Sequence, residues 1–258
     1  MLHAVEGWGK TSLAAYAPKP IFLQTKGETG IETLIEALRL PETPHFPESQ
    51  DWNSLLSAVD ILRTGEHDFR TVVIDALNGA ERMCYEHVCE RDFRNDWGEQ
   101  GFLSYGKGPE VALADWRILL NKLDDLRSTC KMTVFILCHT KVKSFKNPTG
   151  ADYDRYQPDM NEKTWGLTHK WADCVLFGNF DVTVQGKGGK ELVDTSKKGK
   201  GLGGKQRILY TERDAAYDAK NRLGLPAEID MGGSAAEGWG NFINAVKAAR
   251  ETTQEAQQ

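Results

Sequence analysis

The sequence predicts an α/β domain built on a mostly parallel sheet, and two observations support this fold class. Fully apolar runs such as 71–74 and 133–138 are typical of strands that are covered on both faces. Between such runs, apolar residues recur at helical spacing, as they do over 113–126. The 258 residues are enough for one large domain, which we place at 1–250, followed by a polar tail at 251–258.

The expected elements alternate regularly in the first part of the chain and change character after residue 173. There the strands become shorter and some are expected to be antiparallel. The expected elements are strands at 21–23, 71–74 and 133–138, helices at 52–62, 80–88 and 113–126, short strands at 175–180, 181–185 and 206–211, and a final helix at 235–249.

Composition and charge exclude several classes of protein. Hydrophobic residues make up 40% of the chain and charged residues 27%, which is typical of a folded protein. No apolar run approaches the roughly 20 residues that cross a bilayer, and no secretion signal opens the chain. The five cysteines form no CxxC pair, as expected of reduced thiols in the cytoplasm. Because the net charge is −5, any nucleic-acid site must be a local patch.

The most informative segment is 4–11, Ala-Val-Glu-Gly-Trp-Gly-Lys-Thr. It fits the phosphate-loop pattern G-x-x-x-x-G-K-[ST], except that Ala4 replaces the first glycine. In such loops, glycines allow backbone N–H groups to surround a phosphate. Lys10 is expected to reach the β- and γ-phosphates, and Thr11 to offer its hydroxyl to Mg²⁺. The expected nucleotide-binding residues are Glu6, Gly7, Trp8, Gly9, Lys10, Thr11 and Ser12.

Asp75 provides the acidic partner of this loop. It follows the apolar run 71–74, so its carboxylate is expected at the carboxyl end of a buried strand, where P-loop ATPases keep the aspartate that supports Mg²⁺. Thr11 and Asp75 together predict the metal site. Only residues 1–3 precede the loop, fewer than a typical central strand has. We hypothesise that the first strand is very short, or that the chain begins late through a truncated or misassigned start.

Further segments extend the pattern beyond the loop: 10–12, 17–21, 71–75, 139–143, 150–156, 171–173, 210–213 and 216–222. Together they resemble the phage-encoded AAA-type P-loop ATPases of the RecA-like group, over about residues 4–230. The resemblance implies a RecA-like αβα sandwich that binds ATP and Mg²⁺. It also implies single-stranded DNA as a partner, self-assembly into a ring or filament, and possible cooperation with a single-strand-binding protein.

The resemblance also assigns roles near the γ-phosphate. Family members tend to have an acidic residue after the second strand that orients the attacking water, but Gln24-Thr25-Lys26 stands there in this chain. Glu28 is the nearest carboxylate, and we expect it to act instead; otherwise ATP would bind and hydrolysis would be slow or absent. His139 ends the strand 133–138, at the position where RecA-like proteins sense the γ-phosphate.

Basic residues outside the loop fall into three groups. Those after the last strand are implied to approach the nucleotide of a neighbouring subunit: Arg213, Lys220 and Arg222. A long polar loop at 141–163 and a glycine-rich cationic segment at 186–207 are expected to contact DNA phosphates, and Tyr153 and Tyr156 could stack on bases. The expected DNA-binding residues are Lys141, Lys143, Lys146, Arg155, Lys187, Lys190, Lys197, Lys198, Lys200 and Lys205.

We therefore expect an ATP-binding and ATP-hydrolysing protein that acts on single-stranded DNA in homologous recombination or strand annealing, in the cytoplasm of a bacterial host. Two alternatives stay open. The chain could be an ATP-binding accessory or loading factor with little hydrolysis, as Lys26 in place of an acidic residue suggests. It could also be a small-molecule kinase, because fold does not determine function.

Overall fold

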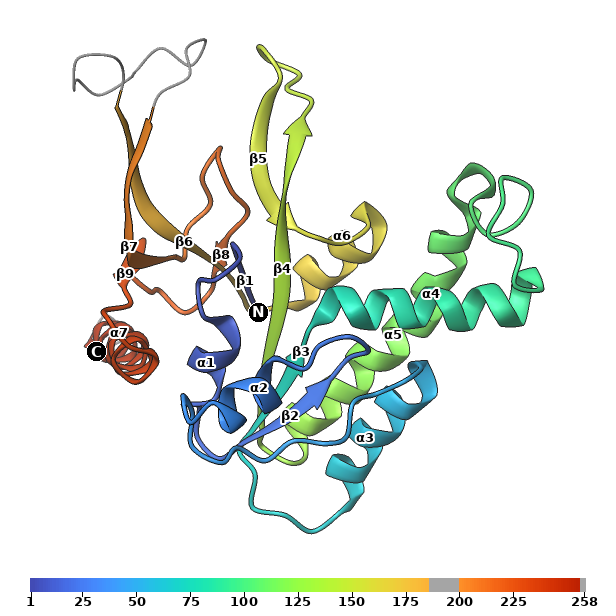
Figure 1. The fold of residues 1–258 in the computed structure, drawn as a ribbon, viewed down its shortest axis with the longest axis horizontal. Coiled ribbons are helices and arrows are strands. Elements are labelled where there is room, and N and C mark those ends of the chain that lie inside the picture. Colours follow the sequence, from blue (N-terminus) through green and yellow to red (C-terminus); the bar gives the residue numbers. More distant parts are fainter. Residues whose placement is uncertain (186–199, 256–258) are drawn as a thin grey trace.

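The computed structural model describes residues 1–185 and 200–255, and its elements alternate between strands and helices (Figure 1). The strands are β1 (Leu2–Ala4), β2 (Pro20–Gln24), β3 (Thr71–Asp75), β4 (Thr133–Phe145), β5 (Tyr153–Pro158), β6 (Cys174–Gln185), β7 (Lys200–Tyr210), β8 (Lys220–Asn221) and β9 (Glu228–Asp230). The helices are α1 (Lys10–Ala14), α2 (Gly30–Glu36), α3 (Trp52–Thr64), α4 (Leu77–Phe93), α5 (Lys107–Ser128), α6 (Glu162–Trp171) and α7 (Ala235–Glu255), with a 3₁₀ turn at Ser104–Gly106.

The sheet is parallel in its centre and antiparallel at one side. Its strand order is β2-β3-β4-β1-β6-β7-β9, and the five strands from β2 to β6 along this path run parallel to one another. β7 and β9 are antiparallel, and β5 and β8 pair with β4 and β6 off the main path. The sheet confirms the predicted α/β class, with a mostly parallel sheet and antiparallel strands near the C-terminus.

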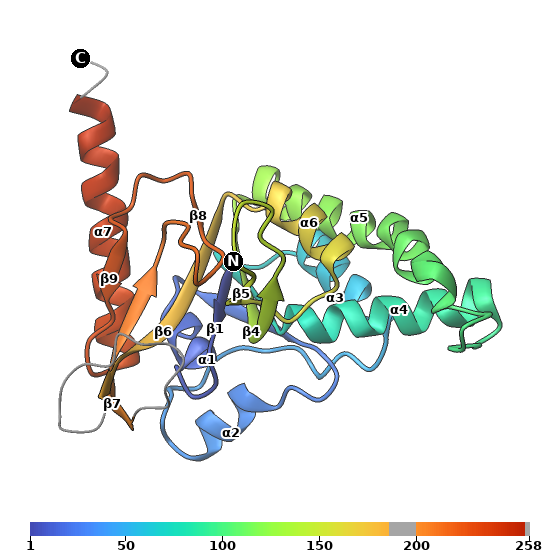
Figure 2. The ribbon, with the colours of Figure 1, turned by 90° about the horizontal axis from the view of Figure 1, so that it is seen from above.

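Two hydrophobic cores cover the two faces of the sheet. The alternation along β3 shows how they form, because Val72 and Ile74 pack with α3, α4 and α5, whereas Val73 packs on the opposite face with α1 and α2. Figure 2 shows α3 to α6 on one side of the sheet and α1, α2 and α7 on the other. The loops at the carboxyl ends of the parallel strands are therefore left free to form a site.

The strand β1 has only three residues, yet it lies in the middle of the sheet. It pairs with β4 on one side and β6 on the other, and all three residues are buried. Leu2 and Ala4 pack into one core, and His3 points the other way with no exposed surface. The phosphate-loop segment thus begins at the centre of the sheet.

Two segments differ from the sequence prediction. The expected polar loop at 141–163 is mostly a β-hairpin, because β4 continues to Phe145 and β5 returns beside it. This hairpin projects from the sheet (Figure 1), so it lacks the apolar face by which strands are recognised in a sequence. The two short strands expected at 175–185 are one strand, β6, whose register shifts between Phe180 and Val182.

The C-terminal helix α7 extends to Glu255, five residues into the segment 251–258 that the sequence analysis separates as a tail. Among the described residues, no helix combines the length and the apolar composition needed to cross a membrane.

Candidate functional site

The segment 5–9 forms a tight loop between β1 and α1. Gly7 and Gly9 have φ values of 72° and 97°, in the left-handed region that favours glycine. Ala4, in contrast, is the last residue of β1 and has no positive φ. Alanine is therefore tolerated at the position where the phosphate-loop pattern has its first glycine.

Trp8 anchors this loop on the sheet. Its indole is 1% exposed and donates a hydrogen bond from Nε1 to the carbonyl of Asn179, at 3.0 Å. It lies so close to Gly178 of β6 that a Cβ there would come within 2.7 Å of the ring. The Trp8 ring is part of the core and is not exposed to a ligand. The expected contribution of Trp8 to nucleotide binding is therefore limited to its backbone in the loop.

The strand order brings the predicted catalytic residues together. In the sheet register Ala4 lies beside His139, and Gln24 lies beside Asp75. The loops that follow β1, β2, β3 and β4 therefore meet at one edge, which explains why Lys10, Glu28, Asp75 and His139 share one site although they are far apart in sequence.

Lys10, Thr11 and Asp75 form the centre of the site. Thr11 Oγ1 donates a hydrogen bond to Asp75 Oδ2 at 2.7 Å, and Lys10 Nζ donates one to the carbonyl of Ala4 at 3.4 Å. Asp75 is 5% exposed, and burial raises the pKa of its carboxyl group although the Thr11 hydrogen bond and the Lys10 charge oppose this shift. Burial likewise lowers the pKa of Lys10, against the attraction of Asp75 and Glu28.

Glu28 and His139 form the outer part of the site. His139 Nε2 lies 2.9 Å from Glu28 Oε1, and this hydrogen bond raises the pKa of His139. The backbone N–H of His139 donates to Asn78 Oδ1 at 3.3 Å. The Glu28 carboxylate thus lies in the site, and His139 holds it there.

These residues fit Mg²⁺ bound to a triphosphate. The Thr11 hydroxyl and the Asp75 carboxylate supply the oxygen ligands that Mg²⁺ prefers. A buried carboxylate with a raised pKa is stabilised by an added cation, and Lys10 is placed to meet the phosphates. Glu6 lies in the loop and is exposed, and Ser12 lies in α1 and is partly exposed.

Two residues that sequence reasoning missed support the site. Thr25 Oγ1 donates to the carbonyl of Ala76 and accepts from its N–H, both at 3.0 Å, which joins the end of β2 to the residue after Asp75. Arg207 of β7 donates to the carbonyls of Trp8 at 3.4 Å and Ser234 at 2.7 Å. Neither role has a local sequence signal, because each depends on a backbone partner distant in the chain.

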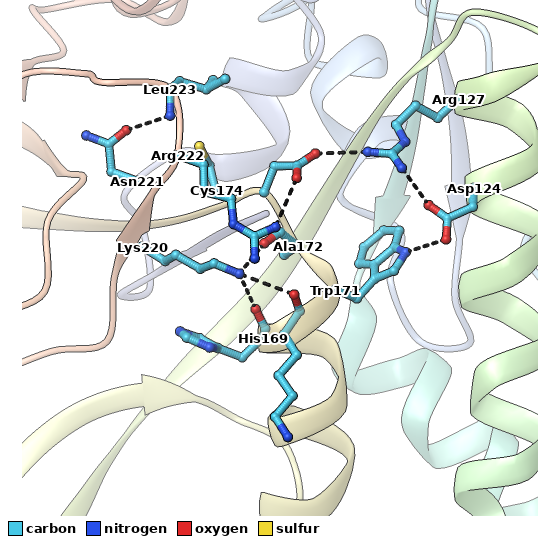
Figure 3. A network of polar contacts seen from close by, with 12 residues as sticks. Asp124, Arg127, His169, Trp171, Ala172, Cys174, Lys220, Asn221, Arg222 and Leu223 are labelled. Carbon is cyan, nitrogen blue, oxygen red and sulfur yellow. Dashed lines mark hydrogen bonds and ion pairs between the residues drawn. The ribbon is translucent and has the colours of Figure 1, made fainter.

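Lys220 and Arg222 make contacts within their own subunit, and the expected contact with a neighbouring nucleotide stays a prediction for both. Lys220 Nζ donates to the carbonyls of His169 at 2.7 Å and Ala172 at 2.6 Å, at the C-terminus of α6 (Figure 3). Arg222 pairs with Asp173 at 3.3 Å. Arg213 is exposed, so the expectation for it stays a prediction.

Replacing Lys220 with alanine is expected to lower the free energy of unfolding by about 1–2 kcal/mol, because the last carbonyls of α6 lose a cationic donor. Urea unfolding measures this change, and Arg213→Ala is the matched control from the same segment. If Lys220→Ala unfolds as the wild type does but loses ATPase activity, the role in a neighbouring site would be correct instead.

The cations of the β4–β5 hairpin are paired with carboxylates of the same chain. Lys141 contacts Asp159 at 2.9 Å, Lys143 contacts Glu162, and Lys146 contacts Asp152 at 2.6 Å. The three lysines are at the surface, where such ion pairs contribute about 0–1 kcal/mol to the stability of the fold. A DNA phosphate can therefore displace the carboxylate.

Arg155 is a correction to the expected DNA-binding set. Its side chain is 4% exposed and pairs with Asp218 at 2.5 Å, so it cannot reach a DNA phosphate. Lys187, Lys190, Lys197 and Lys198 lie outside the described residues, and the backbone of Lys200 begins β7. Lys205 is exposed and lines a cavity beside the phosphate loop.

Asp218 joins three elements through a single residue. Its carboxylate pairs with Arg155 of β5 and accepts a hydrogen bond from Trp165 Nε1 of α6 at 3.2 Å. Its backbone carbonyl lies 2.8 Å from His3 Nε2 of β1. Burial lowers the pKa of His3 to about 4, so this histidine is neutral near pH 7 and donates its proton in the network.

Comparison with known proteins finds one matching family model. A family model described as an AAA domain matches residues 1–223. No curated protein matches the chain in sequence. Among solved structures the chain is similar to the crystal structure of the RadB recombinase, with 14% identity, a TM-score of 0.44, and coverage of 92% of this chain and 88% of that chain.

Proposed function

The chain belongs to the AAA domain family, and we propose that it is a Mg-dependent ATPase of RecA type that acts on single-stranded DNA. The observation that supports this best is the meeting of Lys10, Thr11 and Asp75 at the end of the phosphate loop. The loop supplies nucleotide binding, and the adjacent Glu28–His139 pair supplies a polar group for hydrolysis.

In the proposed reaction, water attacks the γ-phosphate, and the protein acts mainly by positioning and charge stabilisation. Lys10 stabilises charge on the phosphates, and Glu28 orients the attacking water. His139 holds Glu28 in position, since its Nε2 lies within hydrogen-bond distance of the Glu28 carboxylate. In this proposal His139 also senses the γ-phosphate. When bound, Mg²⁺ would neutralise phosphate charge next to Thr11 and Asp75.

We further propose that DNA phosphates are bound mainly by the segment 186–207. It contains seven basic and two acidic residues. Of the two basic residues in it whose side chains the structure describes, Arg207 donates to backbone carbonyls of the fold and Lys205 is exposed. Lysines of the hairpin make a smaller contribution because each is already paired. Self-assembly, cooperation with a single-strand-binding protein and a role in phage recombination or strand annealing are the parts of this proposal that rest on the sequence resemblance.

The decisive measurement is the ATPase rate against single-stranded DNA concentration at two salt concentrations. We expect DNA to increase the rate, and the affinity for DNA to fall with salt by a slope of about −0.7 per neutralised phosphate. Lys10→Ala is the inactive control. ATP binding without turnover at any DNA concentration would contradict hydrolysis and favour the accessory or loading factor.

One observation favours a kinase as the second candidate. A cavity of about 750 Å³ borders the site through Lys26 and Asn78 and is large enough for a small acceptor molecule. Phosphate transfer to such an acceptor, together with no affinity for DNA, would support the kinase over the DNA-dependent ATPase.

A further inference from the structure

Gln24 lies beside the metal site predicted at Thr11 and Asp75. It is the last residue of β2, and in the parallel register it is paired with Asp75, the last residue of β3. The residues just before this pair, Leu23 and Ile74, pack into the core with α3, α4 and α5. Because side chains alternate along a strand, Gln24 and Asp75 both point to the opposite face of the sheet.

Contacts with the helices on that face agree with this arrangement. Asp75 accepts the hydrogen bond of Thr11 from α1, and Gln24 Nε2 donates to Glu32 Oε1 of α2 at 3.3 Å. The beginning of α2 also lies against α1, because a Cβ built on Gly30 would be 3.7 Å from Thr11 Oγ1. Gln24 therefore lies on the same side of the sheet as the Thr11 hydroxyl, between α2 and Asp75.

The amide oxygen of Gln24 has no hydrogen-bond partner. The residue is 1% exposed, and within residues 1–185 and 200–255 no group donates to its Oε1. A carboxylate only accepts hydrogen bonds, so the amide nitrogen has to face Glu32 and the oxygen has to face elsewhere. An unpaired acceptor in a buried place costs stability. The oxygen therefore needs a donor that the described part of the chain does not supply.

The waters of a bound Mg²⁺ are the donors that fit this oxygen. Phosphate oxygens of a nucleotide only accept hydrogen bonds. The Thr11 hydroxyl already donates to Asp75, and the Lys10 ammonium is expected on the phosphates. Magnesium retains several waters when it binds phosphates and one or two carboxylates, and its charge makes these waters strong donors.

We propose that Gln24 is a positioning residue of the metal site, whose Oε1 accepts a hydrogen bond from a water carried by Mg²⁺. This inference rests on the proposed function. An amide suits the place because it adds no charge next to Asp75, whose pKa is already raised by burial and by the charge of Glu28. The oxygen is closed to solvent in the structure, so we expect metal binding to shift the end of the Gln24 side chain.

The test measures the affinity of the metal rather than the rate of hydrolysis. Mn²⁺ replaces Mg²⁺, a non-hydrolysable ATP analogue is bound, and electron paramagnetic resonance reports the free metal. Gln24→Met keeps the length of the side chain and removes the acceptor, so we expect Mn²⁺ binding to weaken by about five- to tenfold. Binding of the analogue without metal, and urea unfolding of the protein without ligand, should stay as in the wild type.

Two further variants sharpen the test. Gln24→Glu retains an oxygen acceptor at this place and should retain most of the Mn²⁺ affinity. Gln157→Met is the matched control, because it makes the same change at a partly exposed glutamine of β5 and should alter neither metal nor nucleotide binding.

Each other outcome has a distinct meaning. Wild-type Mn²⁺ affinity in Gln24→Met would show that this inference is wrong while the nucleotide site stands. An equal loss of metal-free nucleotide binding in Gln24→Met would indicate damage to the loop and would also overturn it. So would a loss in Gln24→Glu as large as that in Gln24→Met, because the oxygen would then be unimportant. If the wild type bound neither the analogue nor the metal, the proposed function itself would fail.

Discussion

Replacing Lys10 with alanine is expected to weaken Mg-ATP binding by about 100-fold, because charge-assisted contacts to phosphates in a partly buried site contribute several kcal/mol. The Lys10 ammonium is placed by the start of α1 and by its hydrogen bond to Ala4, and burial already lowers its pKa. Phosphates would add a direct anionic partner for this ammonium group, whose hydrogen bond in the protein alone goes to the carbonyl of Ala4. Titration calorimetry with ATP and Mg²⁺ measures the loss.

Lys19→Ala is the matched control for this prediction. Lys19 lies nine residues further along the chain, is more than half exposed and pairs with Asp68 at the surface. Its replacement should leave ATP binding unchanged. If Lys10→Ala bound ATP as the wild type does, and its thermal unfolding showed an intact fold, the nucleotide site would have to lie elsewhere.

Replacing Glu28 with glutamine is expected to lower the rate of ATP hydrolysis by about 100-fold or more and to change ATP affinity by less than about twofold. Glutamine keeps the shape of the side chain and can still contact His139. Its amide cannot accept a proton from water, so the attack of water on the γ-phosphate becomes slow. Single-turnover hydrolysis and calorimetry separate the two effects.

The pKa of His139 provides a second readout of the same substitution. Glu28 raises this pKa through its hydrogen bond, so Glu28→Gln should lower it, which an NMR titration detects. Glu32→Gln is the control, since this carboxylate lies on the neighbouring helix and is contacted by Gln24 rather than by His139. Wild-type hydrolysis in Glu28→Gln would exclude Glu28 as the residue that orients water.

The parts of the site that could be predicted are those with a local signal. Residues 4–11 show their chemistry in sequence because a loop that surrounds phosphate needs glycines at set positions. Asp75 could be placed because a fully apolar run indicates a buried strand, and the carboxyl ends of parallel strands meet at one edge. Their contact then follows from the sheet order.

The parts that could not be predicted depend on pairing between distant residues. A basic residue in a sequence shows its charge but not its partner, so Arg155 looked available although Asp218, 63 residues away, neutralises it in a buried pair. The backbone carbonyls of α6 that Lys220 contacts could not be predicted for the same reason. The β4–β5 hairpin was missed because it projects from the sheet and has no core-facing pattern.

Asp218 has a consequence for interpreting inactive variants of this protein. Its carboxylate fastens the hairpin to α6, so replacing the side chain releases both, while its backbone carbonyl stays beside His3 of the strand before the phosphate loop. A screen for loss of activity would recover changes at this position alongside true site residues, although Asp218 is absent from the group around Lys10 and Asp75. Such variants lose activity because the fold is less stable. Their unfolding should therefore be measured before a chemical role is assigned to the residue.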